Sequence, residues 1–294
     1  MMKIVDAHHH IWRQRDLPWL MGPMQPRIFG RYEAIRRDYP IEEFLADIEG
    51  RGIVKSVYVQ ANWARDRFED EVAWVQDEGE RTGWPHAIVG YCDMTVEDAR
   101  PALDRLAKYS RMRGIRQQFH WHRNPLYRFA SGPDLCRDAN VRRNVARLAD
   151  YGWSFDLQVF APQMKGAAEL ARACPNVTFV LQHSGMPEDM GTEGYAAWKA
   201  ELQALAREQN VVSKLSAYGT FIHRNDTGHI ARILADTVGI FGASRCLFGS
   251  NFPIEKLWTD YGALLGAFQI AASSLDETAR QAVFHDTASR VYKL

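Results

Sequence analysis

Eight short runs rich in β-branched and aromatic residues alternate with helix-like stretches along the chain. Runs of this length predict strands, and the amphipathic spacing between them predicts helices. A helix after each strand is typical of a parallel sheet, because parallel neighbours need a long crossover connection. The expected strands are residues 4–12, 55–62, 86–94, 112–119, 153–160, 176–185, 211–219 and 245–254.

The number of these units predicts how the sheet closes. Eight strand–helix units in 294 residues indicate a single α/β domain over residues 1–294, a (β/α)8 TIM barrel. The alternative is an open, doubly wound sheet. Neither GxGxxG nor GxxxxGK[ST] follows an expected strand, so the nucleotide-binding forms of that alternative lack their fingerprint. The proline-rich segment 13–40 is expected to be a long loop that forms part of a lid.

Composition excludes several classes of partner. Lysine plus arginine and aspartate plus glutamate both number 36, so no net charge attracts nucleic acid or an anionic membrane. No segment is long and apolar enough to span a bilayer, and no signal-peptide core precedes the first strand. The four cysteines form no CxxC pair. These features predict a cytoplasmic protein with a small-molecule substrate, and they leave the oligomeric state open, a homo-oligomer included.

Catalytic groups of a barrel gather at the carboxyl ends of its strands, and this rule selects three histidines. His8 and His10 lie two residues apart on the first expected strand, so they share a face with Asp6, whereas His9 points away. His183 ends the sixth strand. Three imidazoles at one rim either hold a single metal ion, zinc above all, or polarise a substrate carbonyl without a metal.

The same rule selects further polar residues. Arg116 lies on a strand whose two faces both exclude water, so it is expected to meet a carboxylate or ester oxygen of the substrate. The alternative is an ion pair with Asp156. Asn251 follows the eighth strand, and the arginines of the first loop (Arg27, Arg31, Arg36 and Arg37) are expected to be surface charges. The candidates for substrate binding are Trp12, Gln60, Gln118, His120, Asp156 and Lys214.

Four segments resemble the amidohydrolase superfamily: DAHHHIW at residues 6–12, LQHSG at 181–185, FGSNFP at 248–253 and VFHDTASRVY at 283–292. The resemblance covers essentially the whole chain. It is to the lactonase branch, which includes sugar-acid lactonases and the pyrone-dicarboxylate lactonase. It implies a hydrolytic barrel site that contains His8, His10 and His183. The family's eighth-strand aspartate, which takes a proton from water, is replaced here by Asn251.

Two further departures from the family pattern bear on the mechanism. The fourth strand has no bridging lysine or glutamate, and the fifth has Asp156 and Gln158 where two-metal members place histidine, so a binuclear centre is not expected. Members that resemble the pyrone lactonase work without a metal. Asn251 is not basic, but it can orient a water or donate a hydrogen bond to an oxyanion. The base must then be one of the three histidines or Asp156.

The leading prediction is a hydrolase that opens a small lactone, either a sugar-acid lactone or a muconate- or pyrone-type ester, with no cofactor or with one zinc ion. The substrate is expected to carry a carboxylate or hydroxyl groups. One alternative is a decarboxylase of the same superfamily that acts on an unsaturated or aromatic carboxylate. Another is a catalytically inactive relative that binds a small acid. The predicted catalytic residues are His8, His10, His183, Arg116 and Asn251.

Overall fold

The computed structural model describes residues 2–294 and contains one eight-stranded sheet, ordered from β1 to β8 along the chain. Every neighbouring pair of strands is parallel. The chain beyond β8 returns to the end of β1, where the backbone N–H of Asn251 donates to the carbonyl of His8 at 2.7 Å. The strands are β1 (Ile4–His9), β2 (Ile53–Val59), β3 (Ala87–Gly90), β4 (Met112–Gln118), β5 (Ser154–Gln158), β6 (Phe179–Leu181), β7 (Val211–Leu215) and β8 (Cys246–Phe248).

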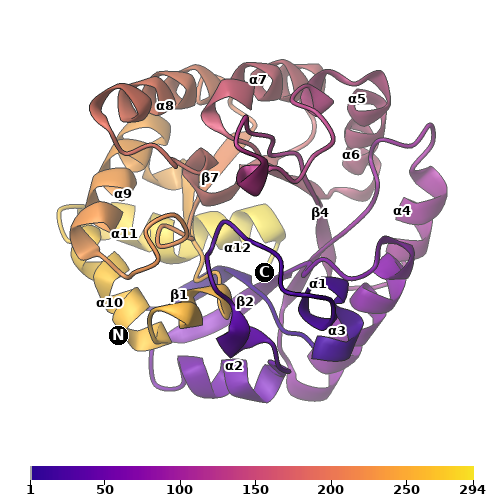
Figure 1. Ribbon diagram of the computed structural model, residues 1–294, viewed down its shortest axis with the longest axis horizontal. Coiled ribbons are helices and arrows are strands. Elements are labelled where there is room, and N and C mark those ends of the chain that lie inside the picture. Colours follow the sequence, from indigo (N-terminus) through magenta and orange to yellow (C-terminus); the bar gives the residue numbers. More distant parts are fainter. Residues whose placement is uncertain (1) are drawn as a thin grey trace.

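Helices surround this sheet in a ring, so the predicted (β/α)8 barrel is confirmed over the whole chain (Figure 1). Their apolar faces pack on the strands, as in α2, which buries Ile41, Phe44 and Ile48. No helix in residues 2–294 combines the length and the apolar character needed to cross a membrane. The helices are α1 (Pro18–Met21), α2 (Ile41–Ile48), α3 (Phe68–Thr82), α4 (Arg100–Leu106), α5 (Ala139–Ala146), α6 (Leu148–Tyr151), α7 (Met164–Ala173), α8 (Thr192–Leu205), α9 (Thr227–Phe241), α10 (Tyr261–Ala271), α11 (Glu277–Gln281) and α12 (Thr287–Tyr292).

The barrel interior is filled by small and branched side chains, and α12 packs against them. Tyr292 and Ala288 of α12 join a buried cluster formed by residues of β1, β2, β3, β6, β7 and β8. The C-terminus accordingly lies near the middle of the ring in Figure 1. Tyr292 also donates its hydroxyl to the buried carboxylate of Asp156 at 3.0 Å. The chemistry must therefore lie at the opposite end of the barrel, where the strands end.

The first loop is tied at both of its ends. Trp12 and Tyr39 exchange two backbone hydrogen bonds of 2.8 and 2.9 Å, which close the segment between them into a compact unit. The loop is less irregular than expected, because the short helix α1 begins at Pro18, where proline has no N–H to lose.

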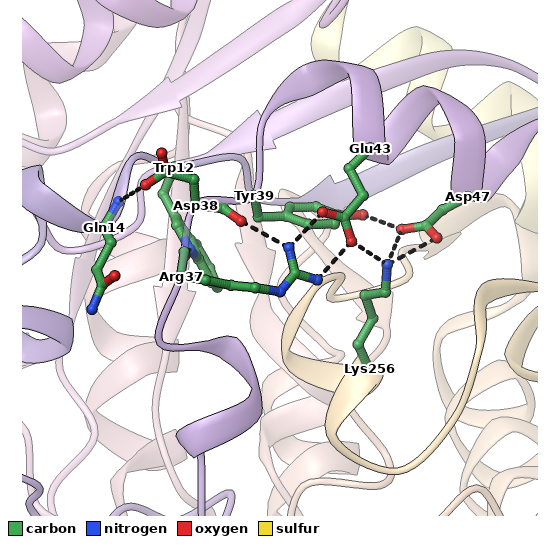
Figure 2. Close-up of polar contacts among 8 residues, drawn as sticks. All are labelled: Trp12, Gln14, Arg37, Asp38, Tyr39, Glu43, Asp47 and Lys256. Carbon is green, nitrogen blue, oxygen red and sulfur yellow. Dashed lines mark hydrogen bonds and ion pairs between the residues drawn. The ribbon is translucent and has the colours of Figure 1, made fainter.

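A network of charged side chains holds this loop against α2 and against the segment after β8 (Figure 2). The guanidinium of Arg37 pairs with Glu43 at 2.5 Å, and Glu43 also accepts from Lys256 at 2.7 Å. Lys256 reaches Asp47 as well, at 2.8 Å. Because Lys256 follows Asn251 by five residues, the network braces the segment that carries Asn251.

Candidate active site

A cavity of about 380 Å³ lies at the carboxyl ends of the strands. It brings together residues that follow β1, β2, β6 and β8 and residues at the ends of β4 and β5. The predicted residues in its lining are His10, His183, Arg116, Asn251, Trp12, Gln60 and Gln118. Most of the residues selected by strand ends alone therefore share one cavity.

The three histidines lie close together, and two of them, His10 and His183, line the cavity. The ring centroid of His8 is 5.0 Å from that of His10 and 4.9 Å from that of His183. Nδ1 of His10 lies 2.6 Å from the carbonyl oxygen of Val59. A carbonyl only accepts, so Nδ1 carries the proton and Nε2 of the neutral ring presents a lone pair. Nδ1 of His183 lies 2.8 Å from the hydroxyl of Ser216, which can either donate or accept, so this bond orients the ring without fixing its tautomer.

These imidazoles are neutral at ordinary pH. Burial lowers the pKa of His8, His10 and His183 well below the usual value of 6.5, and the nearby cations Lys214 and Arg116 lower it further. His8 is fully buried, and neither of its ring nitrogens has a hydrogen-bond partner among the described residues. His8 is not part of the cavity lining. Nε2 of the neutral His10 ring therefore accepts a hydrogen bond and cannot donate one to a carbonyl.

Asp6 does not share the face of the histidines, which corrects the prediction from alternation. Its carboxylate accepts from the hydroxyl of Tyr261 on α10 at 3.0 Å and from the backbone N–H of Ser250 at 2.9 Å. The register of β1 against β2 shifts between Asp6 and His9, and such a shift breaks the strict alternation of sides. His9 points away from the cavity as expected and stacks on Phe44, with 3.8 Å between ring centroids.

Arg116 is a buried cation in the cavity wall. Its side chain is buried, and its only hydrogen bond to a described residue goes from the guanidinium to the carbonyl of Gln60. Nε has no partner. Burial lowers the pKa of Arg116 to about 10, so the group stays charged at neutral pH. The alternative ion pair with Asp156 is not formed, because the carboxylate of Asp156 takes Lys214 at 2.9 Å.

Asn251 is fixed by its own backbone and by a buried acid. Its φ of 58° lies in the left-handed region, which asparagine tolerates better than most residues. Its side-chain N–H donates to Glu255 at 3.4 Å, and the indole of Trp258 donates to the same carboxyl group at 2.8 Å. Glu255 accepts from the amide nitrogen, so the amide oxygen of Asn251, which lines the cavity, remains an acceptor for a ligand or water. Burial raises the pKa of Glu255 to about 8.

The order of these residues along the barrel is that of a known family. A family model described as Amidohydrolase matches residues 5–294. The chain belongs to the amidohydrolase family. This amidohydrolase is 34% identical to the uncharacterised y4mH protein of Sinorhizobium fredii, over 99% of this chain and 98% of that protein. It is 28% identical to an L-fucono-1,5-lactonase of Burkholderia multivorans, over 99% of this chain and 96% of that protein.

Solved structures agree with this assignment. The crystal structure of an amidohydrolase from Burkholderia multivorans with bound HEPES superposes on this amidohydrolase with a TM-score of 0.83, at 26% identity over 99% of both chains. A second structure of that target, also with a TM-score of 0.83, contains zinc. The resemblance to the amidohydrolases inferred from the four sequence segments is thus confirmed.

The zinc of that neighbour raises the question of whether this amidohydrolase has a matching donor set. The unbonded nitrogens of His8 and the Nε2 lone pair of His10 are chemically suitable ligands, and the bond from His10 to Val59 is typical of a second shell. Within residues 2–294, however, no three His, Cys, Asp or Glu side chains are placed to hold one ion together. Asn251 supplies no carboxylate. The arrangement does not fit a complete mononuclear centre, so the mechanism below rests on the chain's own groups.

Sequence reasoning missed the acidic residue of this site. Glu71 belongs to the first turn of α3, yet it lines the cavity and is only 1% exposed. Oε1 accepts from the hydroxyl of Tyr58 at 2.7 Å and from the backbone N–H of Ala61 at 2.5 Å, whereas Oε2 takes no bond from a described residue. Burial raises the pKa of Glu71 to about 7. A signal was present, because Glu71 shares a helical face with the apolar Val75.

One peptide group links Glu71 to Arg116. The carbonyl of Gln60 accepts from Arg116, and the N–H of Ala61 in the same peptide group donates to Glu71. The positive end of the peptide dipole therefore faces the carboxyl group and the negative end faces the guanidinium. Both charged groups are fixed in the cavity wall by a rigid connection.

Three predicted substrate contacts lie outside the cavity lining. Asp156 and Lys214 form a fully buried ion pair in the barrel interior, and Asp156 is further held by Gln182 at 2.9 Å. Strand position alone could not show that these side chains satisfy one another. His120 is buried against Phe129, with 5.4 Å between ring centroids. Arg27, in contrast, was expected to be a surface charge but lines the cavity.

The buried histidines should make the protein sensitive to acid. The pKa values of His9 and His120 are lowered to about 3 by burial, so between pH 3 and 6.5 the unfolded chain binds the protons that these folded imidazoles refuse. We expect the free energy of unfolding, measured with urea, to rise from pH 4.5 to 6.5, because burial also lowers the pKa values of His8, His10 and His183, and the five buried histidines outnumber the two buried glutamates. Each histidine contributes about 1.4 kcal/mol per pH unit. Glu71 and Glu255 oppose this trend, because their raised pKa values make the folded state bind more protons.

A matched pair of variants isolates the histidine contribution. In His120→Gln the slope of unfolding free energy against pH should decrease, because one uncharged buried imidazole is removed. His285, which is partly exposed and hydrogen-bonds to Asp286, serves as the surface control, and His285→Gln should change the slope less than His120→Gln does. An equal slope in wild type and His120→Gln would contradict the assignment.

Proposed function

We propose that this amidohydrolase hydrolyses a lactone, with Arg116 polarising the ring carbonyl. The observation that carries the proposal is a buried guanidinium that forms no ion pair with a described residue and lies in the same cavity as Asn251 and His10. A desolvated cation strongly stabilises the negative charge that develops on a carbonyl oxygen under attack. The relatives named L-fucono-1,5-lactonase support a lactone as the substrate class.

The remaining groups can hold and deprotonate the attacking water. The amide oxygen of Asn251 and the Nε2 lone pair of His10 both accept hydrogen bonds, so together they orient a water in the cavity. The oxygen of this water bonds to the carbonyl carbon, its proton passes to Glu71, and the ring C–O bond breaks. The former ring oxygen then takes that proton from Glu71 and becomes the hydroxyl group of the hydroxy acid product.

Glu71 is a better base than the candidates chosen from sequence. Asp156 is engaged by Lys214 outside the cavity, and the buried histidines have pKa values too low for effective proton abstraction. A carboxyl group with a pKa near 7 matches the pH at which a cytoplasmic enzyme works. The base is thus supplied from α3, in place of the aspartate that Asn251 replaces.

Acid release from a panel of lactones tests this function. The panel should cover sugar-acid lactones, muconolactone-type and pyrone-type rings and aryl- or alkyl-substituted butyrolactones, each with and without added zinc or manganese. We expect turnover of at least one class without added metal and in the presence of a chelator. The absence of turnover from the whole panel would refute the proposal. Carbon dioxide release from an unsaturated or aromatic carboxylate would instead support the decarboxylase alternative.

Asn251→Asp distinguishes a working asparagine from a damaged site. A second carboxyl group beside Glu255 would raise the pKa of the pair, because two adjacent carboxylates cannot both ionise easily. It would also remove a neutral group that orients water, so we expect lactone turnover to fall by about tenfold or more. Activity that appears only in Asn251→Asp would show instead that the natural chain is an inactive relative that binds a small acid.

A further inference from the structure

The cavity has an inner and an outer part that differ in chemistry. The reacting groups at its inner end, Arg116, His10 and Asn251, are buried. The outer end is formed by loops whose side chains are partly exposed, and Phe129 is 36% exposed. Five aromatic residues of this outer part come from four different loops or helix starts: Trp19, Phe29, Phe68, Phe129 and Phe221. We call this outer part the aromatic vestibule.

The aromatic vestibule is thermodynamically unfavourable when no ligand fills it. Apolar surface kept in contact with water is unfavourable by about 25 cal/mol per Å², so its convergence from separate loops indicates a ligand with apolar surface. Trp19 and Phe29 both line the cavity, with 6.1 Å between their ring centroids and an angle of 66° between their rings, so they pack edge to face in one apolar wall. The hydroxyl groups of a sugar acid would need donors and acceptors that these rings do not supply.

A cation without a protein partner stands in the same vestibule. Arg27 lies over the ring of Trp19 at 5.7 Å and makes no ion pair with a described residue. Its Nε is buried and has no hydrogen-bond partner. Its neighbour on the loop, Arg31, shows the usual alternative, since it pairs with Glu33 at 2.7 Å and is largely exposed. Arg27 is therefore available to an anionic group of a ligand.

We propose that the aromatic vestibule binds the apolar tail of the substrate and that Arg27 binds a carboxylate at the end of that tail. The substrate class is then a lactone with an aryl or alkyl substituent that ends in an acid, rather than a compact sugar lactone. This inference rests on the proposed function in one respect, namely that the lactone ring lies beside Arg116. Binding of the tail can be measured without any turnover.

The test uses the full-length protein and two probes that cannot be hydrolysed, 4-phenylbutyrate and gluconate, with calorimetry and tryptophan fluorescence as readouts. We expect 4-phenylbutyrate to bind at least about tenfold more tightly than gluconate and to change the intrinsic tryptophan emission of the protein. Arg27→Gln should weaken 4-phenylbutyrate by about tenfold, the effect of losing one charge-assisted hydrogen bond. The matched control Arg31→Gln should bind as wild type does, and 4-phenylbutanamide should not distinguish Arg27→Gln from wild type.

Each outcome decides one question. Equal or tighter binding of gluconate, or unchanged 4-phenylbutyrate binding in Arg27→Gln, would overturn the vestibule assignment even if sugar lactones are hydrolysed. Arg27-dependent binding of 4-phenylbutyrate would establish it even if no lactone in the panel is turned over, and only the proposed function would then fail. Phe29→Ala, on the same loop, provides a second variant that should weaken 4-phenylbutyrate and 4-phenylbutanamide alike.

Discussion

Arg116→Gln is expected to lower kcat/KM for a lactone substrate by about 100- to 1000-fold, the usual loss when one preorganised donor to a developing oxyanion is removed. Glutamine retains a donor, but it carries no charge and is too short to reach the carbonyl of Gln60 as arginine does. The charge matters because the side chain is buried, where water does not screen it. Steady-state acid release gives kcat and KM separately, and the loss should lie mainly in kcat.

Arg113 provides a matched control on the same strand. It lies on β4 outside the cavity and donates only to backbone carbonyls, including that of Ser110 at 2.7 Å. Arg113→Gln should retain full activity. Because Arg116 is buried, its variant must first be shown to fold by its circular dichroism and melting temperature, and Arg116→Lys supplies a charged alternative. Full activity in a folded Arg116→Gln protein would remove this residue from the mechanism.

Glu71→Gln is expected to lower kcat by about 100- to 10,000-fold, the range attributed to a general base. In the wild type, kcat/KM should rise with pH through about 7, because Glu71 must lose its proton before it can accept one from water. The variant should lack this rise, since glutamine does not titrate. Glutamine keeps an acceptor for Tyr58 and Ala61, so the wall of the cavity should be preserved.

The neighbouring Glu69 is the control for Glu71. It lies on the same turn of α3 but faces solvent, where it pairs with Arg105 at 2.9 Å. Glu69→Gln should retain both the rate and the pH profile of the wild type. If Glu71→Gln lost activity but kept the rise near pH 7, Glu71 would be a positioning residue and the base would lie elsewhere.

The barrel could be predicted because its determinants are local. Strand and helix periodicities are written in neighbouring residues, and eight repeats leave few topologies. The same rule placed His10, His183, Arg116 and Asn251 in one cavity, since parallel strands end at one rim. It did not predict the left-handed backbone at His183 and Asn251, where φ is 55° and 58°. Strands β6 and β8 are shorter than expected, so both residues lie in the segments that follow them.

By itself, then, the sequence determined the alternation that closes the barrel and the residues at its strand ends. Only the tertiary structure decided which charges are satisfied and which are free. Asp156 and Lys214 looked available but cancel one another in the interior, whereas Glu71 looked like an ordinary helix-opening acid and faces the cavity. Arg27 looked like a surface charge. The physical reason is that burial and ion pairing depend on contacts between residues far apart in the chain, and no local pattern records those contacts.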